Sequence, residues 1–180
     1  MSSVVIAGNT SGSVTLSAPD IAGTTTLTLP STSGTVVTTN TMPTGSVLQV
    51  VSYQTESANI STTSNSYVTT NVSASITPSS SSNKILIMLN SNCDTSASAR
   101  QAVITFYRGA TNLAPNRGIN QAYSGAGRLQ SSTTSVYLDS PSSTSSTTYT
   151  VYFKSTTAGN SVDFATDNLM VSLILMEIKG

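Results

Sequence analysis

Short apolar runs alternate with polar residues along most of the chain, with the two-residue period of β-strands. From residue 45 onward, turn segments rich in Ser, Asn, Pro and Gly separate these runs, and no segment keeps a helical period. The pattern predicts eight strands, near 46–54, 66–76, 83–90, 101–108, 118–123, 128–138, 147–155 and 168–178. We therefore expect an all-β chain whose residues 45–180 form an antiparallel β-sandwich head of the jelly-roll type.

Two of the predicted strands are apolar on both faces. In 84–90 one face holds Ile85, Ile87 and Leu89, and the other holds Leu86 and Met88. In 168–178 one face holds Leu169, Val171, Leu173 and Leu175, and the other holds Met170, Ile174, Met176 and Ile178. A sandwich strand in a monomer normally has one wet face, so the second apolar face needs cover from a loop or a neighbouring subunit. We expect a homotrimer whose interface contains Met170, Ile174, Met176 and Ile178.

The first 44 residues contain a repeat that is marked by glycines spaced 11 residues apart: Gly12, Gly23, Gly34 and Gly45. Each glycine is followed by Ser or Thr and a short β-prone run, which predicts one strand between turns at the glycines. Val14 and Leu16 share one face, as do Leu27 and Leu29.

So few apolar side chains cannot form a core. We expect residues 1–44 to be an extended β-repeat stem and attachment segment, ordered by stacking on copies from other chains. The alternative is a low-complexity Ser/Thr linker.

The composition excludes several classes of site. The chain has 34 serines and 30 threonines, no histidine and one cysteine, and seven basic residues balance seven acidic ones. Without histidine there is no Ser-His-Asp, Cys-His or His-metal site, and one cysteine allows no internal disulfide. We expect no enzyme activity, no cofactor, no metal and no nucleic-acid partner. The longest apolar run, 169–176, is too short to span a bilayer, and residues 1–4 show neither a basic nor a long apolar segment, so we expect no secretory signal.

Three local motifs are better explained by structure than by chemistry. Cys93-Asp94 lacks the cation that lowers the pKa of a nucleophilic thiol, so an ordinary loop or core thiol is expected. The glycine-rich segment 124–127 lacks the ending of a phosphate-binding loop and predicts a turn. Asp163 and Asp167 lack the spacing of a calcium loop and are expected on a solvated turn.

Four of the seven basic residues, Arg100, Arg108, Arg117 and Arg128, lie within 29 positions. Together with nearby tyrosines they have the residue types that are favoured at recognition sites. The alternative is that these are scattered surface arginines. Our hypothesis for a receptor-facing loop names Arg117, Tyr123 and Arg128.

Parts of the chain resemble fibre-like virion proteins of tailed bacteriophages, cyanophages and marine phages among them. The resemblance rests on GSVTLSAPDIAGTTTLTLPSTSGTVVTT at 12–39, on GSVLQVVSYQT at 45–55, and on SYVTT at 66–70 and ITPSSSSNKILI at 76–87. It covers about residues 10–90 and is only stylistic beyond them. It implies a non-enzymatic virion protein, made in the host cytoplasm without a signal peptide, and it transfers no catalytic residue.

Two virion roles fit the resemblance. One is a short trimeric tail fibre or appendage, attached to another virion protein by its N-terminus and presenting its head to a host-surface glycan or protein. The other is a capsid decoration protein that stabilises the capsid without binding a receptor. A glycan-cleaving role needs two suitably spaced carboxylates, for which seven scattered acids offer a poor basis.

Overall fold

The computed structural model describes residues 3–17, 20–21, 23–24, 26, 31–34, 37, 42–56, 58–95 and 97–180, and every regular element in these ranges is a β-strand. The chain divides into two compact units, Met1–Thr38 and Thr39–Gly180. The strands of the larger unit are β3 (Val47–Thr55), β4 (Ile60–Thr62), β5 (Val68–Ile76), β6 (Lys84–Thr95), β7 (Arg100–Arg108), β8 (Thr111–Asn112), β9 (Asn120–Ser124), β10 (Leu129–Asp139), β11 (Thr147–Ser155), β12 (Val162–Phe164) and β13 (Val171–Ile178).

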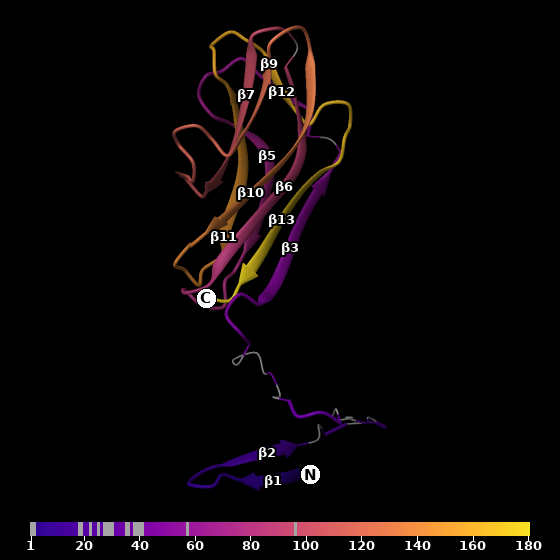
Figure 1. Ribbon diagram of the computed structural model, residues 1–180, viewed down its shortest axis with the longest axis vertical. Coiled ribbons are helices and arrows are strands. Elements are labelled where there is room, and N and C mark those ends of the chain that lie inside the picture. The colour runs from indigo at the N-terminus through magenta and orange to yellow at the C-terminus, as the bar shows by residue number, and fades with distance from the viewer. Residues whose placement is uncertain are drawn as a thin grey trace. The chain divides into compact units, whose positions relative to one another are not determined.

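Two antiparallel sheets form the larger unit (Figure 1). In the first sheet, β3, β13, β6 and β10 lie in that order. The short strand β12 pairs with the last residues of β6, and β4 pairs with β12. In the second sheet the order is β5, β11, β7 and β9, with β8 also paired to β7. Each of the eight predicted strands overlaps one of these eight long strands, and the expectation of an all-β antiparallel structure is confirmed.

The core lies between the two sheets and is built from alternate residues of their strands. Because successive side chains of a strand point to opposite faces, every second residue enters this core. Its largest fully buried apolar side chains are Ile76, Ile85, Ile87, Leu89, Ile104, Phe106, Tyr149, Phe153, Phe164, Leu173 and Leu175.

Two predicted strand boundaries differ from the observed ones by three residues or more. The last strand begins at Val171 rather than 168, because Asp167 and Asn168 have φ values of 60° and 53°, which extended strands do not adopt. Leu169 is therefore exposed rather than buried on the core face. At the other boundary, β6 continues to Thr95, five residues beyond the predicted end at 90.

The extension of β6 is buried although it is polar. The side-chain amide of Asn92 donates to the hydroxyl of Thr166 at 2.9 Å, and Ser91 shares a hydrogen bond with Thr133 at 3.0 Å. The carboxylate of Asp94 accepts a hydrogen bond from Arg128 Nε at 2.6 Å. These partners offset part of the loss of hydration, although Oδ1 of Asn92 and Oδ1 of Asp94 are buried without a hydrogen-bond partner. Hydrophobic periodicity in the sequence cannot reveal such polar contacts.

Among its described residues, the smaller unit contains a hairpin of β1 (Ser3–Ala7) paired with β2 (Ser13–Ser17). The expectation did not include β1. Its register places Val4 opposite Leu16 and Ile6 opposite Val14, so four apolar side chains share one face, and all four are exposed. Gly12, which precedes β2, has a φ of 78°. Of the later repeat units, Gly23 (φ 58°) and Gly34 are described and lie outside any strand, and Gly45 (φ 90°) precedes β3 as predicted. Much of the runs after Gly23 and Gly34, including Leu27 and Leu29, lies outside the described residues.

The chain enters and leaves the head at one end. The N–H of Gly45 donates to the carbonyl of Lys179 at 2.8 Å, and the N–H of Lys179 donates to the carbonyl of Ser46 at 2.9 Å. We call this end the proximal pole. The long strand β6 starts there and runs to the opposite, distal pole, where β7 begins (Figure 1).

Candidate functional site

The outward face of the first sheet carries a continuous apolar patch. Two adjacent rows form this patch. One crosses all four strands through Val50, Met176, Leu86 and Leu138, and the other crosses β13, β6 and β10 through Ile174, Met88 and Val136. We call these seven residues the apolar face. Its edge residues Val50, Val136 and Leu138 are 50–55% exposed, and its central residues are half-buried.

The four residues expected at a trimer interface do not all lie on the apolar face. Ile174 and Met176 belong to it, and Ile178 is in the next row of β13, beside Val47 and Lys84. Met170 precedes β13 and is 47% exposed next to Leu169. The sequence pattern identified the β13 residues, but not their cross-strand neighbours on β3 and β10, because register is not visible in one strand.

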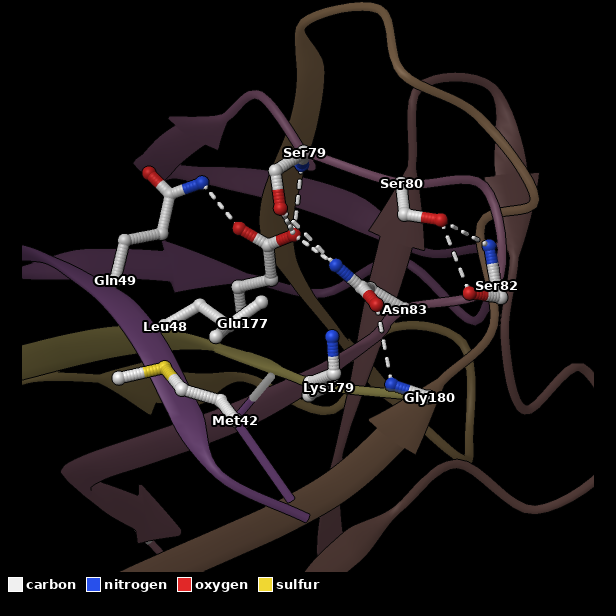
Figure 2. A pocket seen from close by; sticks show the side chains of 10 residues that line it. All are labelled: Met42, Leu48, Gln49, Ser79, Ser80, Ser82, Asn83, Glu177, Lys179 and Gly180. Carbon is white, nitrogen blue, oxygen red and sulfur yellow. Dashed lines mark hydrogen bonds between the residues drawn. The ribbon is translucent and has the colours of Figure 1, made fainter. Parts of the chain in front are cut away.

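A cleft of about 560 Å³ at the proximal pole surrounds the carboxylate of Glu177 (Figure 2). This side chain is 1% exposed, yet it accepts hydrogen bonds from Gln49 Nε2 at 2.6 Å, from the N–H and hydroxyl of Ser79 at 2.7 and 2.8 Å, and from the amide of Asn83. Burial alone would raise the pKa of Glu177, but these donated hydrogen bonds outweigh burial and lower it. The network joins β3, β13 and the turn between β5 and β6, which is a structural role.

The three residues of the receptor-loop hypothesis occupy different surroundings. Arg117 lines a cleft on the outward face of the second sheet. Tyr123 is 59% exposed on the outward face of β9, opposite Gln101 of β7. Arg128 instead pairs with Asp94 of β6, and its guanidinium also lies 3.5 Å from Asp167. The structure thus gives Arg128 an ion-pair role at the distal pole, apart from the cleft that contains Arg117.

The other motifs have structural surroundings. Cys93 is buried, and burial above all, with Asp163 and Asp94 nearby, raises its pKa to about 12, so the thiol stays protonated at neutral pH. The Ser124 hydroxyl donates to the Gly127 carbonyl and closes the turn in 124–127. In the described ranges, no three His, Cys, Asp or Glu side chains gather as metal ligands, and no helix has the length and hydrophobicity needed to cross a membrane.

A second ion pair, missed at the sequence level, lies between the sheets at the proximal pole. The guanidinium of Arg108 donates to both carboxylate oxygens of Asp139 at 2.9 Å, and the Tyr149 hydroxyl donates to the same carboxylate at 2.6 Å. Burial, followed by this hydrogen bond, raises the pKa of Tyr149. The carboxylate of Asp139 is buried, so these donors replace its hydration.

Comparisons with known proteins found little. No protein-family model matches the chain, and no curated protein is significantly similar to it in sequence. A similar solved structure is the D431N mutant VP2 protein of infectious bursal disease virus in derived T=1 particles, with a TM-score of 0.38 and 13% identity. The match covers 92% of this chain and 42% of that protein, so this chain spans less than half of its length.

Proposed function

We propose that the chain is a structural protein of a tailed-phage virion, a short trimeric fibre or appendage that binds and does not catalyse. The support is the resemblance of residues 10–90 to fibre-like virion proteins, together with two units of different character. In the proposed assembly, the smaller unit attaches to another virion protein. The head is presented to the host surface.

The apolar face carries the proposal that the head is a trimer. Seven apolar side chains on an otherwise solvated sheet face are the signature of an interaction site rather than of scattered surface residues. The face holds no charged residue, and the nearest in the adjoining row is Lys84. A second copy of the chain presents an equally uncharged face and is always available as a partner. Packing three such faces around one axis removes them from water.

The strand order favours the jelly-roll form for the head. The eight long strands form the rows β3-β13-β6-β10 and β5-β11-β7-β9. Successive strands change sheet at every step except from β7 to β9, and the first and last strands are adjacent in one sheet. In this arrangement the apolar face and the outward face of the second sheet point away from each other. A trimer built on the first sheet therefore leaves the second sheet free for recognition.

Attachment through the N-terminus is supported by the exposed face of the β1–β2 hairpin. An isolated two-stranded hairpin is at best marginally stable in water, and Val4, Ile6, Val14 and Leu16 are all more than half exposed. A partner that covers this face would supply the missing stability. We therefore place the virion contact at β1 and β2, with Gly12, Gly23, Gly34 and Gly45 as turn positions along the stem.

The test is the mass in solution, measured by light scattering on the full chain and on residues 45–180. We expect three times 18.5 kDa for the full chain and a trimer for the head alone. Met176→Lys would bring three charges together at the axis and should give a folded monomer, whereas Thr150→Lys on the second sheet should leave the trimer intact. A monomeric wild-type head would refute the trimer and favour a decoration protein ordered by its neighbours.

A further inference from the structure

A polar cleft of about 360 Å³ opens on the outward face of the second sheet, and we call it the Arg117 cleft. Its volume falls within the range of small-molecule sites. Strands β7, β9 and β11 and the loop before β9 supply its lining, and no acidic residue is part of it. The lining residues are Gln101, Val103, Asn116, Arg117, Gln121, Lys154 and Thr156.

The two cations of the cleft have no carboxylate partner among the described residues. The ion pairs in those residues use Arg108 and Arg128, which take up Asp139, Asp94 and Asp167. Arg117 and Lys154 therefore leave two positive charges uncompensated in one concave surface. In a chain with only seven basic residues, this is a local positive potential that draws anions toward the cleft.

The cleft is built rigidly. In the loop that carries Arg117, the N–H of Gly118 donates to the carbonyl of Ala114 at 3.1 Å, and the N–H of Ile119 donates to the carbonyl of Ile104 at 2.7 Å. Gly118 has a φ of 70°, and a Cβ there would overlap with Val103 and the Ile104 carbonyl. The loop therefore lies directly on β7, which fixes the backbone next to Arg117.

Aromatic packing holds the second cation in place. The ammonium of Lys154 lies 4.5 Å from the centre of the Tyr67 ring, and Tyr67 in turn contacts Tyr107 edge to face. A site whose charged groups are held before the ligand arrives loses less entropy on binding.

The remaining polar groups suit a hydroxylated ligand. Gln101 donates to Gln121 at 2.7 Å, which orients both amides in the lining of the cleft, and Asn116 adds a third amide to the same lining. A carboxamide offers a donor and an acceptor, and so does a sugar hydroxyl. Two cations, of which Lys154 is held by Tyr67, lie beside three amides and thus match a ligand that carries one anionic group and several hydroxyls.

We propose that the Arg117 cleft binds an anionic sugar, with its carboxylate or phosphate between Arg117 and Lys154 and its hydroxyls on the amides. This inference rests on the proposed function, because it names the chemistry of the host-surface partner. The position fits that role. The cleft uses the distal half of β7 and β11, away from the pole where the chain enters, and it lies on the sheet face opposite to the apolar face.

The experiment measures binding of the full chain to sensor surfaces that carry glucuronic acid, glucose 6-phosphate, glucose or plain phosphate groups. We expect at least about tenfold stronger binding to one or both anionic sugars than to glucose or plain phosphate, since charge-assisted hydrogen bonds add to those of the hydroxyls. The stronger of the two identifies the anion as carboxylate or phosphate. Equal binding to plain phosphate, or none to either anionic sugar, would overturn the inference.

Three variants locate the site. Arg117→Gln and Lys154→Gln should each weaken binding about tenfold. Lys84→Gln, which removes one charge from the opposite sheet, should leave it unchanged. If Lys84→Gln weakened sugar binding equally, the sugar would be attracted by the net charge of the protein rather than by this cleft, and the assignment of the binding site would be overturned. Light scattering on the same samples separates the two proposals, because a trimer that binds no anionic sugar refutes only the cleft, whereas a monomer that binds it refutes only the trimer.

Discussion

Buried carboxylates are the residues on which this charge-poor molecule depends most. The carboxylate of Glu177 is stabilised by neutral hydrogen-bond donors such as Gln49 and Ser79. The carboxylate of Asp139 is stabilised by the guanidinium of Arg108 and the hydroxyl of Tyr149. Each joins segments that are distant in sequence, so each acts as a polar tie within an apolar structure. Replacing one partner leaves the other buried and unsatisfied, which costs more than the interaction contributes on balance.

The first prediction concerns the pH dependence of stability. Because the pKa of Glu177 is lower in the folded than in the unfolded chain, its ionised form stabilises the fold above about pH 4.3, and this contribution disappears as the pH falls through the lowered pKa. Glu177→Gln should lower the free energy of unfolding by roughly 1–3 kcal/mol at pH 7, because the NH2 group of the new amide would face the N–H and O–H groups that now donate to the carboxylate. The difference from wild type should shrink toward pH 3 in urea titrations. An unchanging difference would contradict the ionic role of Glu177.

The matched control is Glu56→Gln, at an exposed position directly after the end of β3. It should change the free energy of unfolding by less than about 0.5 kcal/mol at neutral pH. A similar loss in both variants would show that removing any acid destabilises the head, and that the four donors around Glu177 are not the cause.

The second prediction concerns Arg108. Arg108→Ala leaves the buried Asp139 carboxylate with only the Tyr149 hydroxyl among these partners, and should cost about 2–3 kcal/mol, because a partly exposed guanidinium is worth less than a fully buried one. Chemical denaturation measures the loss. Asp139→Asn in the Arg108→Ala background should recover part of it. No recovery would mean that lost packing, rather than the uncompensated charge, explains the effect.

At the scale of elements, alternation was enough to predict the long strands. Apolar side chains at every second position mark the core faces of β5, β6, β11 and β13, whatever their order in the sheets. The pattern failed where polar residues are buried, as in Asn92 and Asp94 of β6, and where positive φ values at Asp167 and Asn168 shorten β13. The pattern missed β1, because Val4 and Ile6 can be assigned to a strand only when their pairing with Leu16 and Val14 of β2 is known.

The candidate sites were less predictable than the strands. Ile174 and Met176 could be identified from one strand, but Val50 and Val136 join them only through register. The Arg117 cleft likewise needs Lys154, which is 37 positions away in sequence and reaches Arg117 only because β11 pairs with β7. Arg128 was grouped with Arg117 by proximity in sequence, although its partner Asp94 lies in the other sheet.

The third prediction tests the loop that carries Arg117. Gly118→Ala introduces a Cβ where the backbone has φ 70° and where Val103 and the Ile104 carbonyl already stand. We expect a loss of roughly 1–3 kcal/mol in unfolding free energy together with weaker sugar binding. Gly127→Ala, also at positive φ but with open space around it, should cost less and leave binding unchanged. Equal costs would show that backbone strain alone matters.

At the scale of the whole molecule, the chain combines a surface with few charges and a contact face with none. The fourth prediction follows for the proposed trimer. Raising NaCl from about 0.1 to about 1 M shortens the screening length from about 10 to about 3 Å and weakens ionic contacts, but not apolar ones. The trimer fraction by light scattering should therefore not fall. Dissociation at high salt would show that charged residues outside the apolar face hold the copies together.

The antiparallel pairing of β3 with β13 has a mechanical consequence. A virion that holds the chain before Gly45 and a host that holds the distal half of the head would pull on it from opposite ends. The load would enter along β3, whose ladder hydrogen bonds to β13 lie perpendicular to the strand. Those bonds would be sheared together rather than opened one after another. The head would thus serve as a link under tension, with its strongest direction along the line between virus and cell.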